Sequence, residues 1–473
     1  MSPSLRFALC ALLAVFTGSV AARNIDASKF KPEDTITRDV AVVGGGASGT
    51  YAAVRLKDSG KTVVVIESQD QLGGHVDTYT DPTTGFPLDY GVQAYITLPG
   101  VKEFFARFNI PTIAVSQPSF VTQYIDFSTG KPVANYPASD QTAMQTALGT
   151  YAQITGQYLD LFFPGYWNLT LPIPDDLAMP FGQFVQKYNL AAMLPIAWGF
   201  ISAVGDVLDT PTLIMMQNFN AVHIQSLSSG GFFVPASHNN SQLYAAALGY
   251  LSADVLLGSH VSAASRENTG VKLLVKTPAG PKLVIAKKLL FTAPPTTDNL
   301  ATFDLDGTES ALFSKWQFSS VYVGVLSKTG LPDGLDLENA TPNPAKHNLP
   351  TVPFVAQFIF SGLPGLYRAM VVAEPGSSQH DAKQLARAAL DNMARAGTYK
   401  IKRSPNFVAF AGHSPLQLRP SAADLMAGFY QQIYSLQGRR STFYTGAAWS
   451  ADLTSTLWLF TETGVLPAIK AGL

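Results

Sequence analysis

The sequence contains a single cysteine in 473 residues, Cys10, and it lies in the N-terminal segment that we expect to be removed. The mature chain therefore has no thiol, which excludes disulfide bonds, cysteine-ligated metal sites and thiolate nucleophiles. The histidines other than His75 show no metal-ligand spacing. We therefore predict no metal site.

An excess of charge of one sign is also missing. The chain has 32 Lys and Arg against 33 Asp and Glu, a formal net charge of -1. Proteins that bind nucleic acid need a basic surface, so no nucleic-acid partner is expected. After residue 22, no apolar run reaches the roughly 18 residues that a membrane span requires. We therefore predict no stable membrane span.

The first 22 residues have the pattern of a secretory signal peptide. Arg6 supplies positive charge, and residues 7–16 form an apolar run that is too short to span a bilayer of about 30 Å. Small residues follow, and cleavage is expected near Ala21 or Ala22. This pattern predicts a secreted protein.

Three N-x-[ST] sequons fit the secretory pathway, because such asparagines are glycan acceptors in secreted proteins. They begin at Asn168, Asn239 and Asn339. We expect N-glycosylation on at least one of them.

A strand–helix–strand unit opens the mature chain. Residues 39–43 and 62–66 are β-branched apolar runs typical of buried strands. Residues 47–58 between them have helical spacing of apolar side chains. A strand, a glycine turn, a helix and a second strand within about 30 residues form a βαβ unit.

The turn of this unit, Gly44-Gly-Gly-Ala-Ser-Gly49, fits the dinucleotide-binding pattern G-x-G-x-x-G. Gly44 permits a tight turn, Gly46 lets the backbone approach a pyrophosphate, and Gly49 lets the helix pack closely. The helix N-terminus, at Ala47 and Ser48, offers N–H donors to the anion. Glu67 ends the second strand, where a carboxylate accepts hydrogen bonds from a free ribose.

Further motifs distinguish FAD from NAD. Leu72-Gly-Gly-His75 follows Glu67, Leu88-Asp-Tyr-Gly91 comes next, and Tyr444-Thr-Gly-Ala-Ala-Trp449 lies near the C-terminus. With the glycine loop, these runs resemble the flavin amine oxidoreductase family, and within it the secreted fungal enzymes of the β-cyclopiazonate dehydrogenase type. The resemblance covers nearly the whole mature chain and implies FAD as the cofactor.

The resemblance also implies the fold and the domains. We expect an α/β protein in which a Rossmann-type, amine-oxidase-like FAD-binding domain is interleaved with a mixed α+β substrate domain. The FAD-binding domain would comprise residues 36–100, 235–300 and 435–473. The substrate domain would comprise residues 101–234 and 301–434.

Two later segments are implied to complete the FAD site. Val261 matches the strand whose backbone contacts adenine in the family. Gly446 and Ala447 lie in the last turn, and a helix starting near Ser455 would direct its positive N-terminal dipole at the flavin.

His75 departs from the family, which commonly has Arg after the double glycine. An imidazole is able to contact phosphate or flavin, and it is also a nucleophile that could form an 8α-histidyl bond. Because the mature chain lacks cysteine, His or Tyr is the only expected covalent anchor. Both alternatives, contact and covalent attachment, stay open.

The substrate pocket departs from the family too. Residues 320–326, on the strand where amine oxidases place a lysine near flavin N5, contain none. Simple amine oxidation is therefore disfavoured relative to oxidation of a larger molecule. Candidate pocket residues are Gln93, Tyr95, His413 and Trp449.

Three functions remain open at this point. The first is an FAD-dependent oxidoreductase that takes a hydride from an apolar small molecule, a secondary metabolite, with oxygen or another acceptor reoxidising the flavin. The second is a redox-neutral flavin isomerase. The third is an FAD-fold binding protein without turnover, since fold does not determine function.

Overall fold

The computed structural model describes residues 25–115, 120–137, 140–401 and 405–473. The predicted signal peptide, residues 1–22, lies outside these residues. Within them, no helix is long and apolar enough to cross a membrane.

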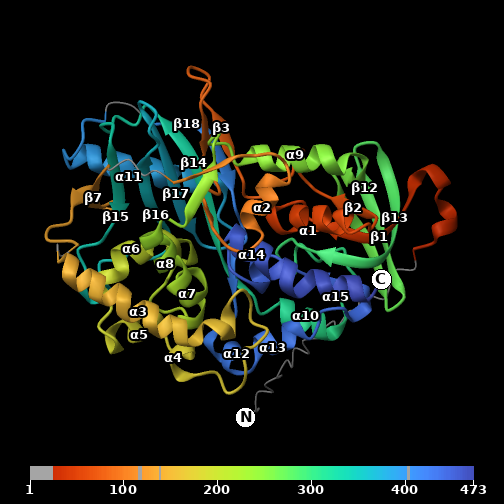
Figure 1. Ribbon diagram of the computed structural model, residues 1–473. Coiled ribbons are helices and arrows are strands. Elements are labelled where there is room, and N and C mark those ends of the chain that lie inside the picture. The colour runs from red at the N-terminus through yellow and green to blue at the C-terminus, as the bar shows by residue number, and fades with distance from the viewer. Residues whose placement is uncertain (1–24, 116–119, 138–139, 402–404) are drawn as a thin grey trace, which may run out of the picture.

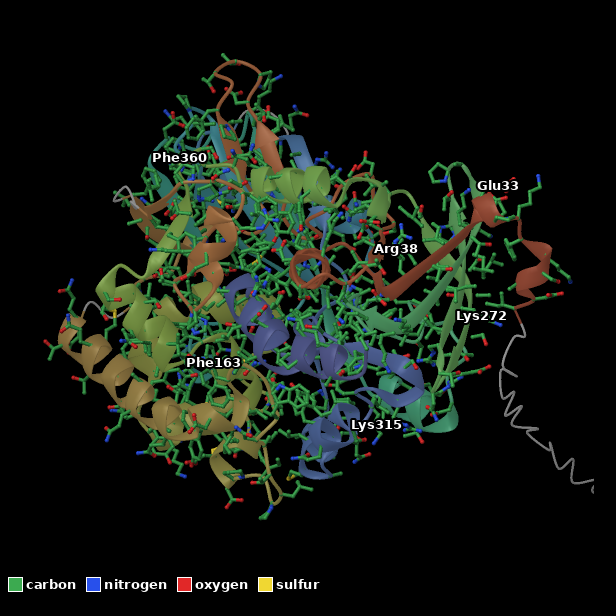
Figure 2. All side chains as sticks on the ribbon, turned by 45° about the vertical axis from the view of Figure 1, so that its right-hand side comes forward. Glu33, Arg38, Phe163, Lys272, Lys315 and Phe360 are labelled. Atoms are coloured by element: carbon green, nitrogen blue, oxygen red, sulfur yellow. The ribbon has the colours of Figure 1, made fainter. Side chains whose placement is uncertain are left out.

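The predicted βαβ unit is present. It consists of β1 (Thr35–Val43), α1 (Ala47–Asp58) and β2 (Val63–Ile66). β1 and β2 pair in parallel, with Val40 opposite Val63. β1 begins earlier than the strand predicted at residues 39–43, because residues 35–38 pair with residues 283–286. Figure 2 shows Arg38 on this strand.

The unit belongs to a larger sheet built from separated parts of the chain. Its order is β10-β2-β1-β13-β12-β11, with β20 also paired to β13. The added strands are β10 (Val255–Leu256), β11 (His260–Glu267), β12 (Gly270–Thr277), β13 (Gly280–Phe291) and β20 (Thr442–Tyr444). β12 and β13 form an antiparallel hairpin, and β13 is one continuous strand through residue 291.

The second sheet has the order β18-β14-β17-β16-β15-β7-β8, and β19 pairs with β14. Its strands are β7 (Val121–Asp126), β8 (Lys131–Pro132), β14 (Gln317–Ser327), β15 (Leu335–Asn339), β16 (Phe354–Phe360), β17 (Leu366–Ala373), β18 (Asn406–Gly412) and β19 (Leu416–Arg419). Helix α11 (Gln379–Arg395) packs on one face of it.

The chain also forms two smaller sheets. One is a hairpin of β3 (Thr78–Thr80) and β4 (Pro87–Asp89). A three-stranded sheet has the order β5-β9-β6, from Tyr95–Ile96, Phe232–Pro235 and Thr112–Ala114.

The remaining helices lie around the two sheets, and Figure 1 shows α3 to α8 grouped below the second one. They are α2 (Val101–Ala106), α3 (Gln141–Phe162), α4 (Asp175–Ala178), α5 (Phe181–Lys187), α6 (Leu194–Ile201), α7 (Thr212–Asn218), α8 (Ala221–Ser229), α9 (Ser241–Leu251), α10 (Gly307–Phe313), α12 (Ala422–Met426), α13 (Phe429–Tyr434), α14 (Thr454–Phe460) and α15 (Leu466–Ala471).

The chain between Ser421 and Gly438 forms two short helices, α12 and α13. Ser421 caps the first, its hydroxyl accepting from the Asp424 N–H at 3.1 Å. Gly428 then adopts a left-handed conformation with φ 82°, which separates α12 from α13. A left-handed residue interrupts the helical hydrogen-bond ladder and turns the chain.

One of the three predicted glycan sites is buried. Asn339 ends β15 and is 8% exposed. Its amide nitrogen donates to the Val355 carbonyl at 2.8 Å, and its amide oxygen accepts from the Phe127 N–H at 3.2 Å. A glycan on that nitrogen would break the first bond and has no room. Asn168 is exposed and Asn239 is half-buried.

Candidate functional site

The glycine loop is held in a shape that only glycine permits. Gly44 has φ +102°, and a Cβ there would lie 2.6 Å from Thr292 Oγ1. A Cβ on Gly49 would lie 1.9 Å from the Gly44 carbonyl oxygen. The close packing of α1 on β1 therefore depends on these two residues.

The second glycine pair, Gly73 and Gly74 of the Leu72-Gly-Gly-His75 motif, packs against this loop. The Gly73 N–H donates to the Gly45 carbonyl at 2.9 Å. Gly74 has φ +59°, and a Cβ on it would lie 3.0 Å from Gly46 Cα. Because glycines carry no side chains, the two glycine segments together form a surface of exposed backbone atoms at the start of α1, here called the glycine surface.

The start of α1 fits a bound anion. No side chain caps the helix at Gly46, so its first N–H groups are left for another acceptor. The Ser48 hydroxyl is buried, and it has no hydrogen-bond partner among the residues that the structure covers. Such groups suit a pyrophosphate at the helix N-terminus. The Ala47 carbonyl accepts from Trp458 Nε1 at 3.1 Å, which fixes α14 beside the loop.

Glu67 has a structural role in addition to its expected contact with the ribose. Its Oε2 accepts from the Gly45 N–H at 2.5 Å, and its Oε1 accepts from the Gln69 N–H at 2.7 Å. The carboxylate thus ties the glycine loop to the end of β2. Further lone pairs remain on it for ribose hydroxyls, since an ionised carboxylate accepts about four hydrogen bonds.

The later segments lie next to this loop. The Ser259 N–H donates to the Glu67 carbonyl at 2.8 Å, which places the start of β11, with Val261, beside the ribose end. Gly446 has φ +114°, and a Cβ there would lie 2.9 Å from the Thr292 carbonyl. Ala447 follows directly, and α14 begins at Thr454, close to the predicted Ser455.

His75 and His413 form a stacked pair that unites the two halves of the chain. Their ring centroids are 4.3 Å apart with an interplanar angle of 18°. His413 Nε2 lies 2.6 Å from Asp77 Oδ2, so the carboxylate orients this imidazole. Burial and the neighbouring His413 lower the pKa of His75 to about 3, so that its imidazole is neutral.

Asp452 is a second acidic group near this pair. Burial raises its pKa to about 6, while His413 acts in the opposite direction. Gln417 Nε2 lies 3.5 Å from Asp452 Oδ2 and donates to Asn218 Oδ1 at 3.1 Å. Asp77 and Asp452 had not been singled out in the sequence, although Asp77 lies only two residues after His75.

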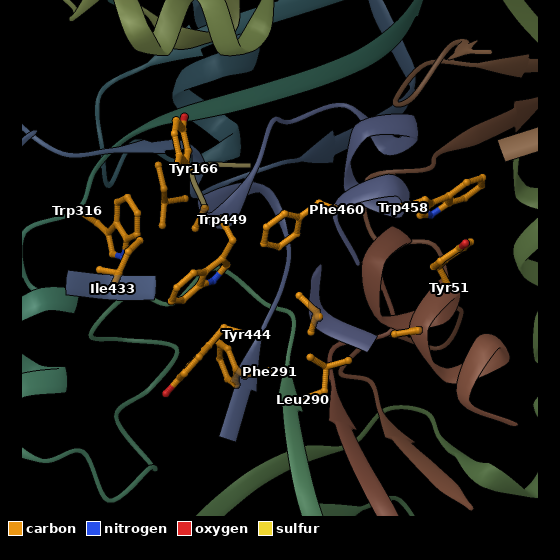
Figure 3. Packing of buried hydrophobic residues seen from close by; sticks show 14 of the residues in the cluster. Tyr51, Tyr166, Leu290, Phe291, Trp316, Ile433, Tyr444, Trp449, Trp458 and Phe460 are labelled. Atoms are coloured by element: carbon orange, nitrogen blue, oxygen red, sulfur yellow. The ribbon is translucent and has the colours of Figure 1, made fainter. Parts of the chain in front are cut away.

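The predicted pocket residues divide into two groups. Gln93 is exposed, and its Oε1 accepts from Arg368 Nη1 at 2.5 Å. Tyr95 and Trp449 are each 0% exposed. Figure 3 shows Trp449 inside the hydrophobic cluster beside Tyr444, with ring centroids 5.0 Å apart. Both side chains pack in the core of the described residues, and their place in a substrate pocket stays a prediction.

The fold and the loop define a dinucleotide-binding protein. Residues 42–108 match the family described as an NAD(P)-binding Rossmann-like domain. Over 449 residues, 94% of each chain, the protein is 37% identical to the FAD-dependent oxidoreductase pigF of Monascus ruber. It is 35% identical over 431 residues to β-cyclopiazonate dehydrogenase of Aspergillus flavus, covering 91% of this chain and 92% of the relative.

Solved structures agree with the fold. A fatty acid isomerase from P. acnes superposes with a TM-score of 0.71 at 17% identity, covering 90% of this chain and 99% of that one. A putrescine oxidase superposes with a TM-score of 0.65 at 15% identity, covering 92% and 100%. These likenesses confirm the predicted amine-oxidase-like fold.

The chain belongs to the family of FAD-dependent oxidoreductases that includes β-cyclopiazonate dehydrogenase. The predictions of FAD as cofactor and of an oxidoreductase are confirmed.

Proposed function

We propose that this oxidoreductase removes a hydride from a largely apolar small molecule, a secondary metabolite. The observation that carries the proposal is strand β14, whose residues 317–327 include no lysine. Ser319 to Leu326 of this strand are all buried. A relative is named for its dehydrogenation of β-cyclopiazonate, which supports a small-molecule substrate.

The chain's own residues bind and orient the cofactor. The glycine surface and the α1 N-terminus hold the pyrophosphate, and Glu67 holds the ribose. FAD supplies the hydride acceptor, N5 of the flavin. The core packing of α14 against α1 keeps the two cofactor-binding segments in a fixed relation, and His75 faces the site as a neutral imidazole.

Flavin bleaching tests the proposal directly. Purified protein is mixed anaerobically with a panel of fungal metabolites, and absorption is followed at the flavin band. We expect bleaching by an apolar metabolite, and peroxide on admission of air if oxygen is the acceptor. An isomerised product without bleaching would instead support the isomerase, and neither change with any bound metabolite would contradict turnover.

We further propose that His75 is the residue bonded to the flavin 8α carbon. Its neutral imidazole has a lone pair for this bond, and its place after Gly74 would bring it to the cofactor. The bond would form as the 8α methyl group loses a proton and the flavin takes up the electron pair, so an acceptor such as oxygen would then have to reoxidise the flavin. Acid precipitation of wild-type protein should leave flavin in the pellet. His75→Ala should release all flavin into the supernatant.

His413→Ala is the matched control, because the two rings stack and either is a potential nucleophile. It should keep flavin in the pellet. Release from His413→Ala but not from His75→Ala would assign the bond to His413. Release of all flavin from the wild-type protein would contradict any covalent bond and leave His75 as a contact only.

We also propose secretion with glycosylation at Asn168 or Asn239. Protein from the native host should lose mass on glycosidase treatment. The double variant Asn168→Gln, Asn239→Gln should show no such loss, because Asn339 is buried. A mass loss that persists in the double variant would show that Asn339 is glycosylated after all.

A further inference from the structure

Three charged residues share one face of the second sheet. Asp336 on β15 lies opposite Ile359 on β16, which lies opposite Arg368 on β17. Directly opposed residues point to the same face, and so does Glu338, two residues beyond Asp336. The alternate residues face α11 and are buried: Leu337, Phe358 and Ala369. The charged face is therefore the one turned away from α11.

Arg368 uses only part of its guanidinium within the protein. Nη1 donates to Gln93 Oε1 at 2.5 Å and to the Asp89 carbonyl at 3.4 Å. Nε is buried and has no acceptor in the part of the chain that is described. The Nε–Nη2 edge, which binds carboxylates in a bidentate manner, is thus unused.

The charge of Arg368 is poorly compensated. Burial lowers the pKa of Arg368, and Asp336 and Asp89 act against this shift. Neither carboxylate forms an ion pair with the guanidinium among the described residues. A half-buried guanidinium without an anion is costly, so the arrangement favours an anionic ligand.

Glu338 adds a second donor to the same face. Burial and Asp336 raise the pKa of Glu338 to about 8, so its carboxyl group is protonated at neutral pH. Its Oε2 is buried and lacks a partner among the residues covered. A protonated carboxyl group donates a hydrogen bond, so Arg368 and Glu338 both suit an oxygen acceptor.

This face is connected to the segment that carries His75. Gln93 and Asp89 belong to the segment that packs on the backbone of His75, whose carbonyl accepts from the Val92 N–H at 3.1 Å. Arg368 therefore lies where the substrate half of the chain meets the cofactor half, and a ligand on its unused edge would lie at this junction.

We propose that Arg368 binds an ionised carboxylate-type group of the substrate, with Gln93 positioning the guanidinium. The proposal rests on the proposed hydride transfer and makes its substrate more specific: an apolar body with one anionic end. Arg368 then anchors the anionic end, and the apolar body reaches toward the flavin.

Calorimetric titration of the FAD-loaded protein with benzoate and with benzamide tests this anchor, because the two probes share shape and differ in charge. Benzoate should bind at least roughly tenfold more tightly, about 1.4 kcal/mol. Arg368→Met should abolish the preference and leave benzamide affinity unchanged. Arg387→Met, on α11 across the sheet, is the control and should keep the preference.

Gln93→Leu is a second variant, and it removes one of the two acceptors of Arg368 Nη1. This variant should bind benzoate several-fold more weakly and should bind benzamide with unchanged affinity. Equal binding of the two probes to the wild-type protein, no saturable benzoate binding, or a preference that survives Arg368→Met would overturn the proposal.

The two proposals fail separately. Bleaching by a metabolite combined with equal benzoate and benzamide affinity would leave the hydride transfer in place and remove the anion site. Arg368-dependent benzoate binding in a protein that no metabolite bleaches would leave an anion site and contradict the hydride transfer.

Discussion

Gly46→Val is expected to give folded protein that purifies without flavin. Gly46 has φ -68° and ψ -167°, which valine adopts without strain. A Cβ at Gly46 would lie 3.7 Å from Gly74 Cα, an ordinary contact, so the fold tolerates it. The valine methyl groups would nevertheless cover the glycine surface where the pyrophosphate must approach the backbone. Flavin absorbance per protein should fall to near zero.

The control for this variant is Gly149→Ala. Gly149 lies on α3, and a Cβ there meets nothing within 4 Å. Its flavin content should equal that of the wild-type protein. Circular dichroism confirms that both variants are folded. Full flavin content in folded Gly46→Val would show that the loop has been assigned wrongly.

Arg266→Met is expected to cost about 3–5 kcal/mol of unfolding free energy, the typical loss when a buried ion pair loses one partner. Arg266 Nε donates to Asp304 Oδ1 at 2.8 Å, and its Nη1 and Nη2 each donate to Glu309 at 2.8 Å. The side chains of Arg266 and its two partners are 1–2% exposed. Without Arg266, Arg440 is the one cation among the described residues that still pairs with these two buried carboxylates.

Arg439→Met provides the comparison. Arg439 pairs with Asp306 at 3.0 Å in the same region, but its side chain is 42% exposed. Exposed pairs contribute about 0.2–1 kcal/mol, so this change should be small. Denaturant unfolding measures both variants. Equal stability losses would contradict a special role for the buried network.

Local sequence was sufficient for the cofactor loop. Gly44, Gly46 and Gly49, the flanking strands and Glu67 lie within one short stretch, and each obeys a local rule of backbone conformation or side-chain periodicity. The helix at residues 47–58 has the predicted ends, and the helix predicted to start near Ser455 begins at Thr454.

Positions that depend on packing between distant segments were predicted less well. Asn339 matches a glycan sequon, yet its amide is bound inside the second sheet. Trp449 and Tyr95 pack in the core of the described residues, and their place in a substrate pocket stays a prediction. A short motif states which residues are adjacent in the chain, whereas burial depends on which strand or helix covers them.

By itself, the sequence determined the βαβ unit, the FAD loop and membership of a flavin-dependent family. Only the tertiary structure brought Asp77 and His413, 336 residues apart, into hydrogen-bond distance. It alone also placed Arg368 beside Gln93 and Gly74 against Gly46. The physical reason is that strand order and register decide these contacts, and both are set by the packing of the whole chain.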